Sequence, residues 1–93
     1  MLDRLVVIGA CHKARAKMAL EKDIGSMEAC LAKSSTPLDR ATMKVVVNES
    51  GALEPKVDGV NDADSRTCLV DVMKQLNIKK TGPGMCLVRW GLR

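Results

Sequence analysis

The chain is poor in aromatic residues. Trp90 is the only aromatic side chain among 93 residues, and Phe and Tyr are absent. Apolar residues nevertheless make up 46% of the chain, which is ordinary for a globular protein. We therefore expect a single small domain whose core is built from aliphatic and methionine side chains.

Long apolar runs are also absent, because no stretch reaches the roughly 18 residues that a membrane helix requires. The segment 5–11 is similar to a lipoprotein cleavage site, but its apolar part is short and Asp3 lies in the region that is normally basic. We expect a domain of a longer chain whose membrane anchor lies elsewhere, with a lipoprotein as the alternative.

Residues suited to catalysis or metal binding are scarce. The chain has one histidine, His12, and no Cys-X-X-Cys motif. His12 adjoins Cys11 and is not at a ligand spacing from two cysteines, so the spacing disfavours zinc. No nucleophile is grouped with a base and an orienting residue. The sequence thus predicts no catalytic residue, no cofactor and no metal site, and a binding protein rather than an enzyme.

Positive charge is in moderate excess. The 15 Lys and Arg residues against 11 Asp and Glu residues give a net charge of +4, spread along the chain. The alternative function is therefore a small basic module that binds nucleic acid. It is less favoured because Trp90, the one side chain able to stack on bases, falls on an apolar strand face. The candidate basic residues are Lys13, Arg15, Lys17, Lys79, Lys80, Arg89 and Arg93.

Two segments have the periodicity of amphipathic helices. In the first third, one apolar stripe at helical spacing contains Leu20, Ile24, Met27, Cys30 and Leu31. The second helix begins at Asn61 or Asp62, which can cap it. Its apolar face contains Cys68, Leu69, Val72, Met73 and Leu76.

Three segments are predicted as strands. Residues 42–48 alternate and are rich in valine, and the turn 48–51 leads into a weaker strand over 52–60. Pro55 places that second strand at an edge or a bulge. The chain ends in a strand over 85–92, while 5–8 is ambiguous between helix and strand.

These elements predict an α+β domain. Helices pack on one face of a short three-stranded antiparallel sheet, in the order helix, strand, strand, helix, strand. Residues 1–20 are expected to form a helical extension, and residues 21–93 the domain itself.

Four cysteines can form a disulfide framework or remain buried thiols. Cys30 and Cys68 lie on the apolar faces of the two predicted helices, so helices that cover one sheet can bring them together. Pairing is favoured over two inert thiols because cysteines in small extracellular domains commonly pair. A second bridge between Cys11 and Cys86 is the weaker alternative, because connectivity does not follow from sequence.

With these elements in place, the chain resembles the C-terminal domains of TonB-like proteins, in particular the AgmX/PglI branch of myxobacterial gliding and envelope proteins. The resemblance covers about the last seventy residues. It rests on the helix with Cys30, the strand 43–47, the turn 48–51, the helix entered at 62–65 with Cys68, and the strand 85–93. Leu31 and the ending Trp90-Gly91-Leu92-Arg93 replace aromatic residues of that branch, and Cys11 and Cys86 lie outside its pattern.

The resemblance implies a disulfide between Cys30 and Cys68 and a periplasmic domain of an inner-membrane-anchored energy transducer or gliding machine. Its partners would be an outer-membrane or periplasmic protein and, through the parent chain, an inner-membrane motor complex. Binding would use β-augmentation, in which a partner segment pairs with an exposed edge strand. The strand around 53–57 is one candidate edge, and the homodimer is a further option for either edge. The other candidate is the final strand, with Met85, Leu87, Arg89, Gly91 and Arg93.

Overall fold

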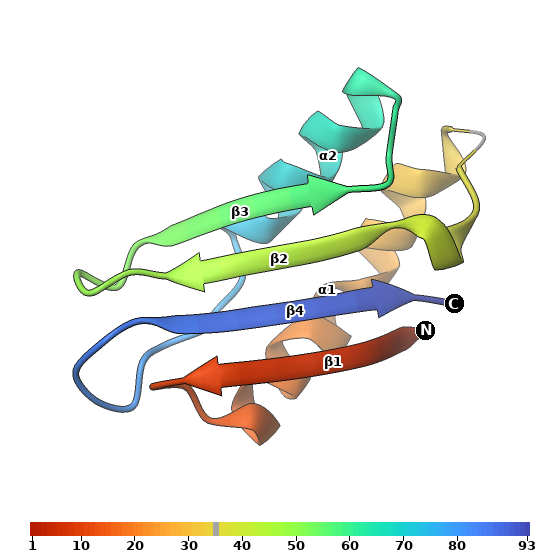
Figure 1. The fold of residues 1–93 in the computed structure, drawn as a ribbon. Coiled ribbons are helices and arrows are strands. Elements are labelled where there is room, and N and C mark those ends of the chain that lie inside the picture. The colour runs from red at the N-terminus through yellow and green to blue at the C-terminus, as the bar shows by residue number, and fades with distance from the viewer. Residues whose placement is uncertain (35) are drawn as a thin grey trace.

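The computed structural model describes residues 1–34 and 36–93, and it shows two helices packed on one face of a four-stranded antiparallel sheet (Figure 1). The elements in chain order are strand β1 (Leu2–Gly9), helix α1 (Lys13–Ala32), a 3-10 turn η1 (Leu38–Arg40), strands β2 (Thr42–Val47) and β3 (Leu53–Asp58), helix α2 (Ala63–Lys74) and strand β4 (Cys86–Leu92). The expected α+β class is confirmed.

The sheet has one strand more than the sequence predicts. Its strand order is β1-β4-β2-β3, and every neighbouring pair is antiparallel. The prediction of a three-stranded sheet is therefore wrong, because β1 pairs with β4 along the whole length of β4. The run Leu5 to Ile8 is apolar without a clear period, so its sequence alone does not distinguish a strand from a helix.

Residues 1–20 do not form a separate helical extension. They contain β1, which belongs to the same sheet as the rest of the chain, and the first part of α1, which continues without a break to Ala32. The boundary expected after residue 20 falls inside this helix. The N- and C-terminal strands lie side by side, and Met1 and Arg93 exchange two backbone hydrogen bonds at their ends.

The core lies between the sheet and the helices. Alternate residues of the central strands β2 and β4 point toward the helices and are fully buried, including Met43, Val45, Val88 and Trp90. From the helices, Leu20, Met27, Leu69 and Met73 fill the other side of this layer. The core is aliphatic and methionine-rich as the composition predicts, with Trp90 as its one aromatic side chain.

Two disulfides cross-link the fold. Cys30 of α1 is bonded to Cys68 of α2, with the Cα atoms 5.6 Å apart, and Cys11 is bonded to Cys86 of β4, with the Cα atoms 5.7 Å apart. Both separations lie in the range that disulfides require. The structure confirms the favoured pairing and also the weaker alternative. Two disulfides in so short a chain indicate an oxidising, non-cytoplasmic compartment.

Removing a disulfide should lower stability by a large fraction of the total. The bridges join residues 38 and 75 positions apart. In the chain-entropy treatment each closed loop stabilises the fold by roughly 4 kcal/mol. We expect Cys30→Ala with Cys68→Ala to lower the free energy of unfolding by about 2–4 kcal/mol, measured by urea denaturation. An unchanged urea midpoint in this variant, compared with the oxidised parent, would show that the bridge is not formed in solution.

One glycine allows two loops to approach closely. Gly59, which follows β3, has a φ of +81°, and a Cβ atom there would overlap the carbonyl oxygen of Arg40 at the end of η1. Gly51 in the β2–β3 turn has a similar φ of +88°, but nothing lies within 4 Å of the position of its Cβ. Both glycines need a positive φ, and only Gly59 lies in close contact with another segment.

Alanine at these two positions should therefore separate backbone strain from steric overlap. Gly51→Ala should lower the free energy of unfolding by about 1 kcal/mol, the cost of the left-handed conformation. Gly59→Ala should lower it by about 3 kcal/mol, because the overlap with Arg40 adds to that strain. Equal losses in parallel thermal or urea unfolding curves would contradict the close approach of Gly59 to η1.

Candidate functional site: the free sheet edges

The sheet exposes two edge strands, β1 and β3. β4 lies between β1 and β2, so its backbone groups are paired on both sides. The prediction that β4 is a partner-binding edge is therefore wrong. The additional strand β1 covers the side of β4 that would otherwise have been free. This correction applies to the predicted edge residues Met85, Leu87, Arg89, Gly91 and Arg93.

The free edge of β3 is interrupted by Pro55. Asn48 donates its N–H to Ala52 O (3.0 Å), so Asn48 and Ala52 form a hydrogen-bonded pair. Along an antiparallel ladder such pairs alternate with pairs whose backbone groups point outward. In the register of β2 and β3, the residues that face outward are then Leu53, Pro55 and Val57. Pro55 has no N–H, so the middle donor of this edge is missing. The predicted edge position of this strand is confirmed, but the proline weakens it as a template for another strand.

The free edge of β1 keeps its donors. Ala10 donates to Met85 O (3.2 Å) and Arg93 donates to Met1 O (2.9 Å), so Val6 and Ile8 occupy hydrogen-bonded positions toward β4. The backbone groups of Leu2 and Val7 then point away from the sheet. β1 contains no proline. Its outer edge can therefore donate to and accept from an added strand.

A bulge at Arg4 bends this edge. The register between β1 and β4 shifts between Asp3 and Val6, and Arg4 has a φ of +53°. Its guanidinium lies against Gly91, donates to Asp39 O (3.1 Å) and is 3.5 Å from the Asp3 carboxylate. Gly91 leaves room for this side chain because it has no Cβ. The Arg4 side chain thus ties the bulge to η1 and to the exposed face of the sheet.

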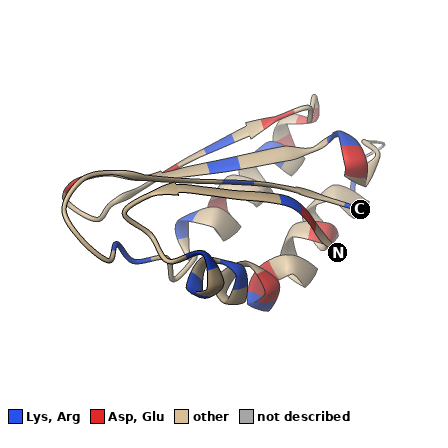
Figure 2. Ribbon diagram, turned by 60° about the horizontal axis from the view of Figure 1, so that its bottom comes forward, with Lys and Arg blue, Asp and Glu red and all other residues tan. Residues whose placement is uncertain are grey.

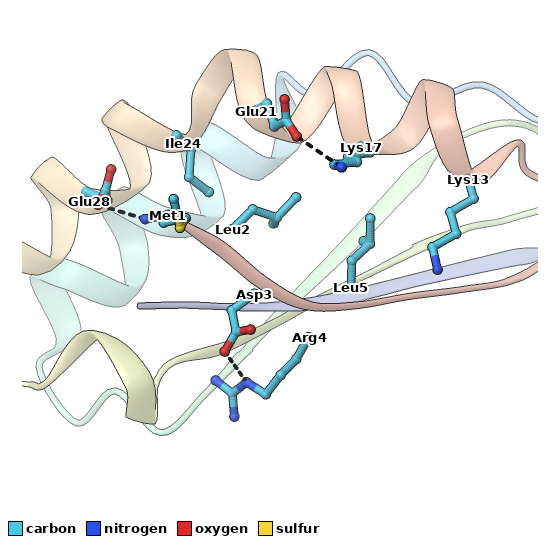
Figure 3. Close-up of a pocket in the computed structure, with 10 residues that line it drawn as sticks. All are labelled: Met1, Leu2, Asp3, Arg4, Leu5, Lys13, Lys17, Glu21, Ile24 and Glu28. Atoms are coloured by element: carbon cyan, nitrogen blue, oxygen red, sulfur yellow. Dashed lines mark hydrogen bonds and ion pairs between the residues drawn. The ribbon is translucent and has the colours of Figure 1, made fainter.

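A groove runs between β1 and α1, and we call it the edge groove (Figure 3). Leu2 and Leu5 point from β1 toward the helix, and Ile24 points from α1 toward the strand. All three side chains are partly buried and pack against the core. The complete lining is Met1, Leu2, Asp3, Arg4, Leu5, Lys13, Lys17, Glu21, Ile24 and Glu28.

The charges of the edge groove are ordered along α1. Lys13 and Lys17 lie toward the start of the helix, and Glu21 and Glu28 follow. Lys17 is 3.8 Å from Glu21, and Glu28 is 3.1 Å from the α-amino group of Met1. Among the described residues Lys13 makes no ion pair, so the groove keeps one uncompensated cation at the end where β1 leaves the sheet.

The predicted basic residues do not form one patch. Lys13 and Lys17 line the edge groove, Arg15 and Lys79 lie in a second groove beside α1, and Arg89 is exposed on β4. Arg93 is at the opposite end of β4 from Lys79 and Lys80 (Figure 1). Trp90 is 1% exposed and lies in the core, so its indole is unavailable for base stacking.

Within residues 1–34 and 36–93, no three His, Cys, Asp or Glu side chains are grouped so as to hold a metal ion. In the same part of the chain, no helix combines the length and the apolar character needed to cross a bilayer. His12 is exposed at the start of α1.

Comparison of the chain with protein-family models, with curated proteins and with solved structures finds no match in any of the three. The function must therefore be argued from the fold and its surfaces. The edge groove is the feature that sequence reasoning missed, because β1 was not assigned. The available signal was the Val- and Ile-rich run 5–8 followed by Gly9, a pattern typical of a strand that ends in a turn.

The direction of the backbone groups of β1 can be measured by amide hydrogen exchange. Val6 and Ile8 should exchange slowly because their N–H groups are bonded to β4, whereas Val7, between them, should exchange much faster. Residue-resolved NMR exchange on the oxidised protein measures all three amides in one sample. Slow exchange at Val7 in the monomer would contradict a free outer edge.

Proposed function

We propose that this protein is a non-enzymatic protein-protein interaction domain that binds an extended segment of a partner protein as an additional strand along β1. The observation that carries the proposal is that the free edge of β1 lies directly beside the edge groove. Main-chain hydrogen bonds from an edge supply affinity, and the pockets beside it supply selectivity for alternate side chains.

The edge groove fits a strand added next to β1. Alternate side chains of an added strand would point toward the helix side of the sheet. There the side chains at the near end of the added strand would meet the partly buried side chain of Leu5, and Leu2 and Ile24 continue the apolar lining beyond the bulge. Apolar residues at alternate positions are therefore the expected partner sequence, and an acidic residue near Lys13 would add an ion pair worth up to about 1 kcal/mol at this exposed position.

The bulge limits how much of β1 is used. The irregular stretch between Asp3 and Val6 interrupts the regular spacing of outward donors and acceptors. A straight partner strand would pair best with the segment from Leu5 to Gly9. Gly9 O already accepts from Cys11 (2.9 Å), which closes the far end of the edge. The recognised segment should accordingly be short.

The disulfides place the domain in an oxidising compartment, and the resemblance to TonB-like domains supports the periplasm as that compartment. In this proposal the parent chain is anchored in the inner membrane, and the domain transmits energy or force from a motor complex to an envelope partner, as in transport or gliding. A second copy of the chain is the other candidate for the added strand, because the β1 edge of one copy can pair with that of another.

The experiment is a selection of random linear peptides displayed on phage, using the oxidised domain as bait, followed by binding of the selected synthetic peptides. We expect Val7→Pro to weaken binding by about tenfold, because it removes one outward donor and places a ring at the edge. Val7→Ala is the matched control, because it truncates the same side chain but keeps the N–H, and it should change affinity by less than about threefold.

The NMR spectrum of each variant with bound peptide locates the contact. Binding along β1 should shift the amides of Leu5 and Val7 and of Lys17 and Ile24 in α1. Equal losses for Val7→Pro and Val7→Ala, or shifts confined to β3, would refute pairing at β1. Sedimentation of the peptide-free protein tests the homodimer, which Val7→Pro should dissociate.

A further inference from the structure

A second groove lies on the other side of α1, and we call it the cationic groove. It is formed by the first half of α1 and by the segment that follows α2. Its lining includes Arg15, Met18, Ala19, Lys22, Ile78 and Lys79. None of these residues lines the edge groove.

The walls of the cationic groove are fixed to each other. Cys11, just before α1, is bonded to Cys86 and forms a β-bridge with Lys80. Thr81 donates its N–H to Ala10 O (2.8 Å). The buried side chains of Ala16 and Ile78 also line the groove, and each is close in sequence to one of these contacts. The groove is thus held in shape by a covalent bond and backbone pairing rather than formed by two independent loops.

The lining carries three cations and no carboxylate. Arg15, Lys22 and Lys79 are exposed, and no ion pair is formed by any of them among the described residues. Glu21, the carboxylate that precedes Lys22, lines the edge groove and pairs with Lys17 there. No carboxylate in the lining therefore compensates the three positive charges. Figure 2 shows the Lys and Arg segments of the helices in blue and the Asp and Glu segments in red.

Apolar side chains lie between the cations. Arg15 and Lys22 are seven residues apart on α1, which places them on one side of the helix about 10 Å apart. Met18 and Ala19 lie between them, and Met18 is 71% exposed. A ligand that matches this arrangement carries an anionic group for the guanidinium and ammonium donors and an apolar part for Met18.

We propose that the cationic groove binds a phosphate ester attached to an apolar group. Arginine and lysine side chains donate charge-assisted hydrogen bonds to phosphate oxygens, and Arg15 can do so with two parallel bonds. Such a group occurs in the headgroup of an anionic phospholipid and in soluble phosphoesters, and the two sources can be distinguished experimentally. The proposal does not depend on the pairing of a partner with β1.

The test uses the full oxidised chain and two probes. Inorganic phosphate is titrated while amide shifts are followed by NMR, and co-sedimentation is measured with phosphatidylcholine vesicles with and without phosphatidylglycerol. We expect phosphate to shift the amides around Arg15, Lys22 and Lys79, and we expect the protein to sediment only with the vesicles that contain phosphatidylglycerol.

Two variants with the same net charge distinguish binding in the cationic groove from general electrostatic attraction. Arg15→Gln with Lys22→Gln removes two charges from the groove, and Lys44→Gln with Lys56→Gln removes two from paired positions on the exposed face of the sheet. The groove variant should weaken binding of either probe by at least about tenfold, and the sheet variant by less than about threefold.

Each outcome decides the proposal. Phosphate binding that the groove variant weakens, without vesicle binding, would support it and favour a soluble phosphoester, and vesicle binding that the groove variant abolishes would favour a lipid headgroup. Equal losses in the two variants would overturn it, because binding would then follow net charge alone. Absence of binding of both probes would overturn it as well.

Discussion

The pairing of β1 with β4 is the interaction on which the rest of the structure depends. It joins the first strand of the chain to the last and places β1 at the edge of the sheet. Because β4 becomes a central strand, its inward residues Val88, Trp90 and Leu92 are covered on all sides and almost completely buried. α1 begins at Lys13, a few residues after the end of β1, so the helix lies beside β1 and forms one wall of the edge groove.

The two disulfides stabilise different layers of this arrangement. Cys30 and Cys68 join the two helices to each other, while Cys11 and Cys86 join the end of β1 to the start of β4. A core of this size without Phe or Tyr has few large side chains to bury, and small domains commonly compensate by covalent cross-links. The second bridge also fixes the turn that precedes α1, which is where both grooves begin. The bridge at Cys11 therefore contributes both to the stability of the fold and to the shape of the two grooves.

The sequence predicted those helices and strands whose own residues show a clear hydrophobic period. The helix with Cys30, the strand 42–48, the helix with Cys68 and the final strand all have clear periods, and all are present. Segment 5–8 has no clear period, and its conformation depends on pairing with β4, at the other end of the chain. The β-branched residues of 5–8 followed by Gly9 favour a strand, but hydrogen bonding to β4 is what determines the structure of β1. The error in the edge strand followed directly from this one ambiguity.

The pairing of Cys30 with Cys68 was more accessible to sequence reasoning, since both lie on apolar helix faces, whereas the Cys11–Cys86 pairing was only the weaker alternative. The edge groove and the cationic groove were not accessible, because each combines segments that the strand order brings together. Their cations also show why composition is a weak guide here. A net charge of +4 does not say where the basic residues lie, and the fold distributes them over two grooves and the exposed face of the sheet.

The two sheet edges differ in a way that bears on function. An edge strand with unpaired donors is a hazard for aggregation, and proteins commonly protect it with proline or charged residues. β3 has both, in Pro55 and in the exposed alternation of Glu54, Lys56 and Asp58. β1 has neither along Val6, Val7 and Ile8, although Ile8 is 61% exposed. A chain that protects one edge and leaves the other open retains a specific place for an added strand. α1 separates that place from the cationic groove, so a partner strand on one side of the helix leaves the other side free for a second ligand.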